Sequence, residues 1–259
     1  ITRQEAQQRS QVITAHSSKV LVDLSGRDPN GDPLSEPTET FVSSSTIQFS
    51  STGGESHLDL IAEGVYAADL DGTPLDPAAF SHNRFPFTAE PGTHEITVTA
   101  LCRYSHSGEG LHRFVDPADG KVYLYTQFEI ADARRMYANF EQPDQKMTFE
   151  LQVIAPTDWV IVSNSPTPEP TKDPREGMSR WSFEPTLPIS TYLTALIAGE
   201  YHVDHGTIHT ASGEIDANIL CRQSMKEYLD ADRIRTTTQR GFEIYEAEFG
   251  YPYPFDKYT

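Results

Sequence analysis

The sequence predicts a mainly β protein in which a large antiparallel β-saddle or sandwich precedes a shorter mixed α/β region. Three observations support this fold class. Short runs of alternating or β-branched residues recur from Lys19 to about Tyr201, and turn sequences rich in Gly, Pro, Asn and Asp separate them. Beyond Tyr201 the pattern changes to a hairpin and helical segments. Many short strands at this spacing are typical of large antiparallel β architectures.

The β-rich part is expected to follow a short helix within the polar, Gln-rich residues 1–16. The expected strands are Val20–Leu24, Phe41–Phe49, His57–Ala62, Glu95–Tyr104, Val122–Ile130, Met147–Ile154, Trp159–Ser163, Arg180–Phe183 and Thr191–Ala198. The clearest expected turns are Asp28–Pro33, Ser51–Gly54, Asp71–Gly72, Glu90–Gly92 and Asp116–Gly120.

The last sixty or so residues are expected to differ from the β-rich part. A hairpin is predicted around Ala211–Gly213, and Ser224 with an acidic residue three positions later resembles a capping box. A second helix is predicted to begin at Asp230 or Asp232 and to end at Gly250. Its apolar stripe consists of Phe242, Tyr245 and Phe249.

Composition excludes several kinds of partner. With a net charge of −18 over 259 residues, the chain is not expected to bind nucleic acid or an anionic membrane. It contains no apolar run of roughly 18 residues that could cross a bilayer, and no secretory signal segment is recognised. Cys102 and Cys221 do not form a disulfide framework and are expected to be buried strand thiols, which favours a reducing cytoplasm.

One strand carries polar residues of functional interest. In the predicted strand Val122–Ile130 the apolar face comprises Val122, Leu124, Thr126, Phe128 and Ile130. The other face comprises Tyr123, Tyr125, Gln127 and Glu129. A carboxylate, a carboxamide and two phenols in one row can hold a cationic group such as an amine, although an ordinary half-exposed strand shows the same alternation.

The residues around this strand resemble a known family. Thr126–Glu129, Asp132–Arg135 and Asn139–Pro143 are similar to the N-terminal domain motifs of the aminopeptidase N family, which are zinc-dependent gluzincin metallopeptidases. Where this chain has Asn-Phe-Glu-Gln-Pro, family members typically have Cys-Phe-Asp-Glu-Pro. The difference leaves the Gln-x-Glu pair intact.

Further motifs extend the resemblance from about Tyr104 to the last residue. Ser107–Arg113 is similar to the loop that precedes the Gln-x-Glu strand, especially in bacterial members. Pro188–Ala195 and Phe249–Lys257 resemble the passage into the family's thermolysin-like catalytic domain. The resemblance therefore implies an N-terminal β-saddle domain over residues 1–201 and a truncated beginning of the catalytic domain over residues 202–259.

The resemblance also implies site residues and partners. In the family a glutamate of the Gln-x-Glu strand binds the free α-amine of the substrate, so Glu129 is the expected amine anchor and Gln127 its neighbour in the pocket. Peptides with a free N-terminus are the expected substrates, and the remainder of the catalytic domain is the expected partner. The parent protein is then a metallo-aminopeptidase.

The zinc motif of the family is absent from the sequence. His-Glu-x-x-His would place two imidazoles on one helix face, but His94–Glu95 opens a β-rich run and Val98 occupies the position of the second histidine. We therefore expect zinc in the full-length parent, none bound by this fragment, and no catalysis by the fragment alone. The alternative is a non-catalytic β-sandwich interaction module on the same scaffold.

Other polar clusters favour structural roles. His202, His205 and His209 could suggest a metal site, but solvated or structural histidines explain them better. Asp69–Gly72 lacks the remaining ligands of a calcium loop and fits a hairpin turn. Finally, the pair Arg134–Arg135 is expected to form structural ion pairs with Asp132 or Glu141, and a substrate carboxylate is the minor alternative.

Overall fold

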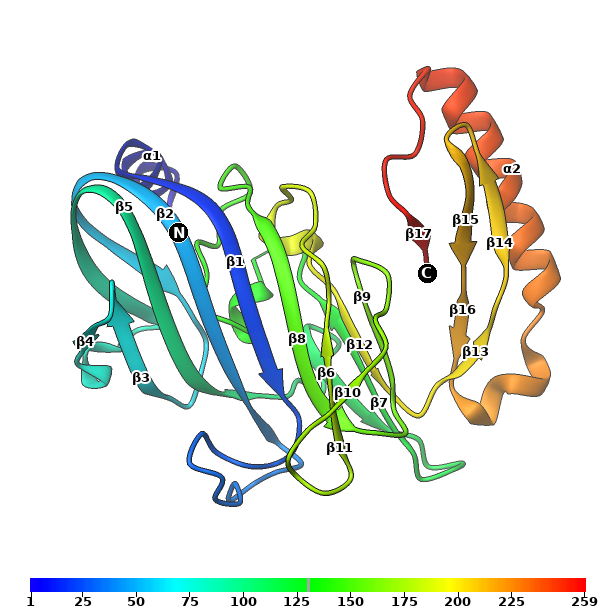
Figure 1. Ribbon diagram of the computed structural model, residues 1–259, viewed down its shortest axis with the longest axis horizontal. Helices are drawn as coiled ribbons and strands as arrows, with labels where there is room; N and C mark the ends of the chain where they lie inside the picture. The colour runs from blue at the N-terminus through cyan, green and yellow to red at the C-terminus, as the bar shows by residue number, and fades with distance from the viewer. Residues whose placement is uncertain (130) are drawn as a thin grey trace. The chain divides into compact units, whose positions relative to one another are not determined.

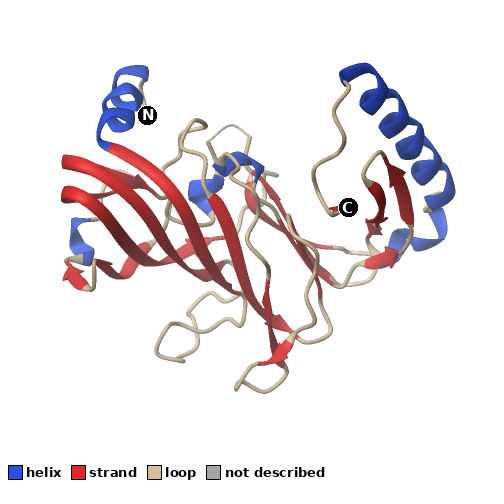
Figure 2. Ribbon diagram, turned by 45° about the horizontal axis from the view of Figure 1, so that its top comes forward, coloured by secondary structure: helices blue, strands red, loops and turns tan. Residues whose placement is uncertain are grey.

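A computed structural model describes residues 1–129 and 131–259. Its contacts divide the chain into two compact units. The first unit consists of Ile1–Phe114 and Leu124–Ile197, and the second consists of Val115–Tyr123 and Ala198–Thr259. The assignment of residues 1–201 and 202–259 to two domains stays a prediction. Most regular structure is β, as expected from the sequence (Figure 2).

An eight-stranded sheet dominates the first unit (Figure 1). Its strand order is β10-β11-β8-β1-β2-β5-β3-β4. Neighbouring strands are antiparallel except β1 and β8, which run parallel. The strands are β1 (Ile13–Asp23), β2 (Thr40–Asp59), β3 (Gly64–Leu70), β4 (Thr73–Leu75), β5 (Arg84–Arg103), β8 (Thr148–Pro156), β10 (Thr171–Lys172) and β11 (Met178–Ser182).

The two faces of this sheet differ in polarity because side chains alternate along each strand. On β5 the residues Ile96, Val98, Ala100 and Cys102 are buried. On the opposite face the hydroxyl pairs Ser44–Thr99 and Thr46–Thr97 join β2 to β5 at 2.9 and 3.0 Å. Both cysteines were expected to be buried strand thiols. Cys102 is buried, which confirms the prediction for this residue, whereas Cys221 is only half-buried.

Two predicted turns lie inside long strands instead. Ser51–Gly54 belongs to β2 and Glu90–Gly92 belongs to β5, and the two segments face each other in the ladder. Gly53 has φ 97°, and a Cβ added there would lie 3.1 Å from the Pro91 ring. Turn residues on opposing strands therefore bend both strands together, as Figure 1 shows, rather than forming two hairpins.

A four-stranded sheet has the order β6-β7-β12-β9. Its strands are β6 (Gly110–Val115), β7 (Val122–Gln127), β9 (Val160–Ser163) and β12 (Leu196–Gly199). The predicted turn Asp116–Gly120 connects β6 to β7. The predicted strand Thr191–Ala198 begins only at Leu196, because Thr191–Leu193 forms the 3-10 helix η3. A similar 3-10 helix, η1 (Pro77–Ala79), precedes β5.

The segment from η2 (Ala133–Arg135) to β8 covers the buried face of the large sheet. The carbonyl of Ala138 accepts a hydrogen bond from Ser45 Oγ at 2.7 Å, and Asn139 forms a β-bridge with Asp59. Gln145 bonds the backbone of β1 through both amide atoms. This segment therefore connects strands β1 and β2, which lie about a hundred residues away in the sequence.

The N-terminal helix α1 (Arg3–Val12) confirms the predicted short helix. Thr2 accepts a hydrogen bond from the Glu5 N–H at 3.2 Å, and the Glu5 carboxylate accepts one from the Thr2 N–H at 2.7 Å. These two contacts form a capping box.

The second unit contains small sheets and the long helix α2. Its regular elements are β13 (His202–Asp204), β14 (Thr207–Thr210), β15 (Gly213–Ala217), β16 (Ile219–Cys221), η4 (Gln223–Tyr228), α2 (Ala231–Phe249) and β17 (Lys257–Tyr258). The predicted hairpin β14–β15 is confirmed, as are the N-cap Asp230 and the helix end at Gly250. The capping role of Ser224 is wrong, because Ser224 lies inside η4 and its Oγ donates to Asp116 Oδ2 at 2.6 Å.

Candidate functional site

The polar face predicted for the strand Val122–Ile130 is shorter in the structure, because β7 ends before Glu129. The strand stops at Gln127, Phe128 turns into the core, and Glu129 lies exposed in the following turn. Tyr125 is partly exposed, whereas Tyr123 is buried, so only part of the predicted polar face is accessible. Ile130 lies outside the described residues.

Gln127 and Glu129 are brought together by a local hydrogen bond. The backbone N–H of Glu129 donates to Oε1 of Gln127 at 2.6 Å. This contact occupies the carboxamide oxygen and leaves the amide NH₂ group as a donor. Among residues 1–129 and 131–259 no hydrogen bond or ion pair reaches the Glu129 carboxylate. The pair therefore presents one anionic acceptor and one neutral donor side by side.

The turn after Glu129 is closed by backbone and side-chain contacts. The Asp132 N–H donates to the carbonyl of Phe128 at 3.1 Å. Nε of Arg135 donates to Asp132 Oδ1 at 2.8 Å, which confirms the predicted structural ion pair. The backbone N–H of Arg134 donates a hydrogen bond to Oε2 of Glu141 at 2.7 Å.

The Ser107–Arg113 motif lies beside β7 because β6 is its neighbour in the sheet. The His112 ring packs on Tyr125 with centroids 4.8 Å apart. Nδ1 of His112 accepts a hydrogen bond from the Gly108 N–H at 3.1 Å. Burial, together with the nearby His106, lowers the pKa of His112, which favours the neutral ring in this aromatic contact.

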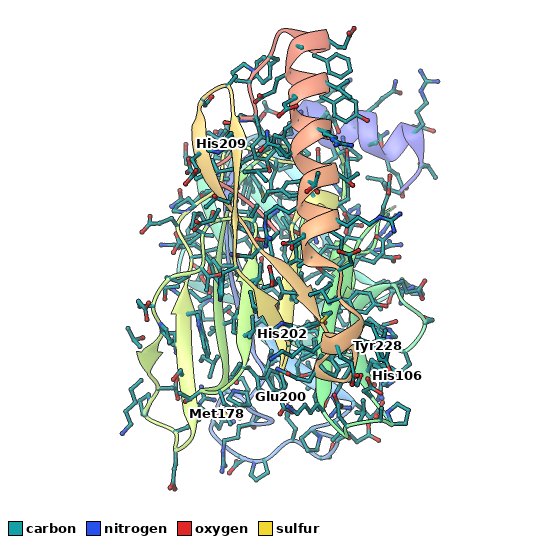
Figure 3. All side chains as sticks on the ribbon, turned by 90° about the vertical axis from the view of Figure 1, so that its right-hand side faces the viewer. His106, Met178, Glu200, His202, His209 and Tyr228 are labelled. Atoms are coloured by element: carbon teal, nitrogen blue, oxygen red, sulfur yellow. The ribbon has the colours of Figure 1, made fainter. Side chains whose placement is uncertain are left out.

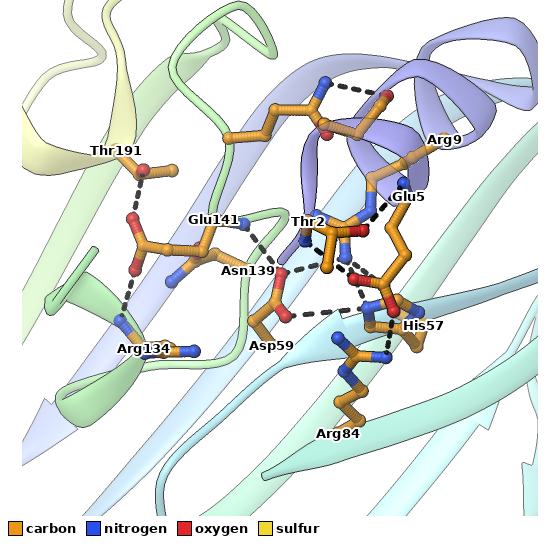
Figure 4. A network of polar contacts seen from close by, with 12 residues as sticks. Thr2, Glu5, Arg9, His57, Asp59, Arg84, Arg134, Asn139, Glu141 and Thr191 are labelled. Atoms are coloured by element: carbon orange, nitrogen blue, oxygen red, sulfur yellow. Dashed lines mark hydrogen bonds and ion pairs between the residues drawn. The ribbon is translucent and has the colours of Figure 1, made fainter. Parts of the chain in front are cut away.

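The Asn139–Pro143 motif has a different environment. Glu141 is buried, and its Oε1 accepts a hydrogen bond from Thr191 Oγ1 at 2.6 Å (Figure 4). Its backbone N–H donates to Asp59 Oδ2 at 3.1 Å. Thr191 belongs to the Pro188–Ala195 motif, so two motifs that are about fifty residues apart meet at this buried carboxylate.

A buried ion pair continues this network. Nη2 of Arg9 lies 2.9 Å from Asp59 Oδ2, and both side chains are 2% exposed. The same nitrogen lies 2.7 Å from Nε2 of His57. We call Arg9, His57, Asp59, Glu141 and Thr191 the Asp59–Glu141 cluster. No local sequence pattern links residues so distant in the chain, so the sequence alone does not predict this cluster.

The two carboxylates of the cluster have opposite pKa shifts. Burial alone would raise the pKa of Asp59, but its contact with His57 and the charge of Arg9 lower it below the usual value. Burial raises the pKa of Glu141 despite the hydrogen bonds from Thr191 and Arg134. Both carboxylate side chains are almost completely inaccessible, so their contacts are with other groups of the protein.

A groove of about 850 Å³ lies beside α1 and the ends of β2 and β5. Its lining includes Glu5, His57 and Arg84. Arg84 donates to Glu5 at 2.9 Å and, with the N–H of Thr2, lowers the pKa of Glu5 to about 2. Within this groove, the charges of Glu5 and Arg84 are therefore paired with each other.

The histidines considered as metal ligands do not come together in the described part of the chain. Within residues 1–129 and 131–259, no three His, Cys, Asp or Glu side chains form a group that could hold a metal ion. His202 and His209 lie on separate strands, β13 and β14 (Figure 3). His205 contacts Asn218 at 3.1 Å, and His209 lies 3.5 Å from Glu214. These contacts favour the structural interpretation of the histidines.

Comparison with known proteins identifies the family. Residues 79–193 match the family model of the peptidase M1 N-terminal domain, and this range contains Gln127, Glu129 and Glu141. The chain is 45% identical to an aminopeptidase N of Streptomyces lividans, over 262 aligned residues that cover the whole chain. The chain carries the N-terminal domain of the M1 peptidase family.

Other M1 relatives match shorter ranges. An aminopeptidase N of Acetobacter pasteurianus is 38% identical over 133 residues, covering 49% of this chain and 37% of the relative. An aminopeptidase N of Bos taurus is 35% identical over 114 residues, covering 42% of the chain and 12% of the relative. The chain spans 29% of the length of the Streptomyces lividans relative. Of the helices that the structure describes, none combines the length and apolar character needed to cross a bilayer.

Proposed function

We propose that the chain is part of a zinc aminopeptidase that releases N-terminal amino acids from peptides, with Glu129 as the anchor for the substrate α-amine. One observation carries the proposal. Within the range matched by the M1 N-terminal domain, the accessible carboxylate of Glu129 is positioned at a strand end by its backbone bond to Gln127.

The chemistry of the pair suits an N-terminal residue. A carboxylate that pairs with an ammonium in a partly dry pocket gains more free energy than an exposed pair does. The NH₂ group of Gln127 can donate to a carbonyl oxygen next to that amine. A pocket of this kind selects a free N-terminus and holds the first peptide bond in one place.

In this proposal, the zinc ligands of the enzyme are not among the residues described above. Zinc would activate the attacking water, and other parts of the parent protein would hold it. In this proposal residues 1–201 form the N-terminal domain, and residues 202–259 begin a thermolysin-like catalytic domain. The chain alone is then inactive.

Exposed aromatic residues on and after α2 form a surface on which another part of the parent protein could pack. Tyr245 and Phe249 are 64% and 76% exposed. Together with Phe242, Tyr251 and Tyr253 they line an apolar groove of about 550 Å³. Because apolar surface of this kind is normally covered, we propose that the remainder of the catalytic domain packs on it. The free thiols Cys102 and Cys221 fit the proposed reducing cytoplasm.

The proposal is tested on the complete protein that contains this chain. The Glu129→Gln variant is compared with Glu184→Gln, which makes the same change at another exposed glutamate. We expect Glu129→Gln to lower kcat/KM for an aminoacyl anilide by about ten- to a hundredfold, because a charged hydrogen bond is lost. Glu184→Gln should keep the wild-type value, and a chelator should abolish activity of both proteins.

Substrate form provides the second arm of the experiment. A peptide with an acetylated N-terminus should be a poor substrate for the wild-type protein, because it has no ammonium to pair with Glu129. Equal kcat/KM in Glu129→Gln and wild type would refute the amine-anchor assignment. Absence of chelator-sensitive hydrolysis in the complete protein would instead favour the non-catalytic interaction module.

A further inference from the structure

The turn that follows Glu129 contains an unfavourable backbone conformation. Ala131 has φ 74°, in the left-handed region that residues with a Cβ rarely adopt. Such a conformation costs free energy, so it persists only where surrounding contacts hold it. The contacts that hold this turn therefore also determine where the Glu129 side chain is presented.

Arg135 makes the side-chain contacts that span this turn. Its Nε donates to Asp132 Oδ1 at 2.8 Å, directly beside Ala131. Its Nη2 lies 3.3 Å from Glu109 Oε1, in the loop that precedes β6. We call Asp132, Arg135 and Glu109 the Arg135 bridge. It joins the turn after Glu129 to a second loop that is about twenty residues away in the sequence.

The stem of Arg135 is also closely packed. Gly110 has φ 65°, and a Cβ added there would lie 2.9 Å from Cδ of Arg135. Glycine at position 110 therefore lets the backbone approach the arginine stem, while the planar guanidinium reaches two carboxylates in fixed directions. Lysine, with a single ammonium group, cannot reproduce both directed contacts.

We propose that Arg135 is a positioning residue for substrate binding, because its bridge holds the turn that presents Glu129. This inference rests on the proposed role of Glu129 as amine anchor. Arg135 itself does not need to contact the substrate. Without the bridge the turn at Ala131 can relax, and the Glu129 carboxylate no longer meets the ammonium in one fixed position.

The test uses the complete protein and a matched control. Arg103 has the same arrangement as Arg135, with Nε 2.8 Å from Glu63 and Nη2 3.1 Å from Glu36. Arg135→Met keeps much of the stem and removes the guanidinium, and Arg103→Met makes the same change at the control position. We expect Arg135→Met to lower kcat/KM for an aminoacyl anilide by about tenfold, chiefly by raising KM. Arg103→Met should leave both constants unchanged.

Two further variants separate positioning from folding. Arg135→Lys should recover part of the lost kcat/KM, since it keeps the charge. Glu109→Gln removes one end of the bridge at an exposed position and should raise KM without lowering the thermal unfolding midpoint. Both results would support the bridge.

A double-mutant cycle distinguishes this inference from the proposed function. If Arg135 acts through Glu129, Arg135→Met should have no further effect on kcat/KM in the Glu129→Gln protein. Independent, additive losses would overturn the inference, as would wild-type KM in both Arg135→Met and Glu109→Gln. Wild-type kinetics in Glu129→Gln would instead refute the role of Glu129 as amine anchor, on which the inference about Arg135 rests.

Discussion

The two ends of the segment between Gln127 and Pro143 are both polar but have opposite environments. Gln127 and Glu129 lie exposed at the end of β7, where the Glu129 backbone is bonded and its carboxylate is accessible. Glu141 lies buried twelve residues later, and both of its carboxylate oxygens accept hydrogen bonds from the protein. One carboxylate is therefore available to a ligand, and the other stabilises the fold.

This difference separates the largely buried Asn139–Pro143 motif from the exposed Gln127–Glu129 pair. The buried part connects α1, β2 and η3 through Glu141, Asp59 and Arg9 (Figure 4). The short helix η2 links the exposed part to this buried network, because the Arg134 N–H donates to Glu141. Substitutions in the two parts should consequently affect different measurements, namely stability for the buried part and substrate binding for the exposed part.

The largest effect on stability is expected from Asp59→Ala. This change leaves the Arg9 guanidinium buried without its ion-pair partner, which should lower the free energy of unfolding by about 3–5 kcal/mol. Urea denaturation followed by circular dichroism measures it. Glu150→Ala is the control, because Glu150 pairs with the exposed Lys19 and should cost less than about 1 kcal/mol. Similar losses in both variants would contradict the structural role of the cluster.

A smaller, pH-dependent effect is expected from Glu141→Gln. Burial raises the pKa of Glu141, so its contribution to stability is fully present below the unfolded-state pKa and is lost as the pH rises through the folded-state pKa. Glutamine does not ionise, and one amide oxygen can still accept from Thr191 or Arg134. The stability of the variant relative to wild type should therefore increase as the pH rises above the unfolded-state pKa of about 4.3. Urea midpoints at a series of pH values measure the difference, and a pH-independent difference would count against a buried, raised pKa.

The smallest effect on stability is expected from Glu129→Gln. Because its carboxylate makes no hydrogen bond or ion pair with the described residues, the free energy of unfolding should change by less than about 0.5 kcal/mol. The same urea experiment measures it. A loss comparable to that of Asp59→Ala would place Glu129 in the structural part of the motif and remove the contrast between the two carboxylates.

Much of the fold was predictable because local patterns decide it. Alternating residues identified the cores of most strands. The start of α2 was narrowed to Asp230 or Asp232, of which Asp230 is the N-cap, and Gly250 marked its end. Two of the errors occurred where the partners are distant in the sequence. Ser51–Gly54 was predicted as a turn, but its glycines bend β2 opposite Pro91 of β5. Ser224 satisfied a capping pattern, but its hydroxyl donates to Asp116 instead.

The sequence by itself determined the β-rich architecture, the relationship to the M1 family and the Gln127–Glu129 pair, because periodicity and motif spacing are local properties of the chain. Only the tertiary structure showed that Glu141, Asp59 and Arg9 form a buried network and that Arg135 bridges Asp132 and Glu109. Burial and ion pairing depend on residues that folding brings together from distant positions. For that reason the sequence showed which residues carry charge, whereas the fold decided which charges are neutralised within the protein and which remain accessible to a ligand.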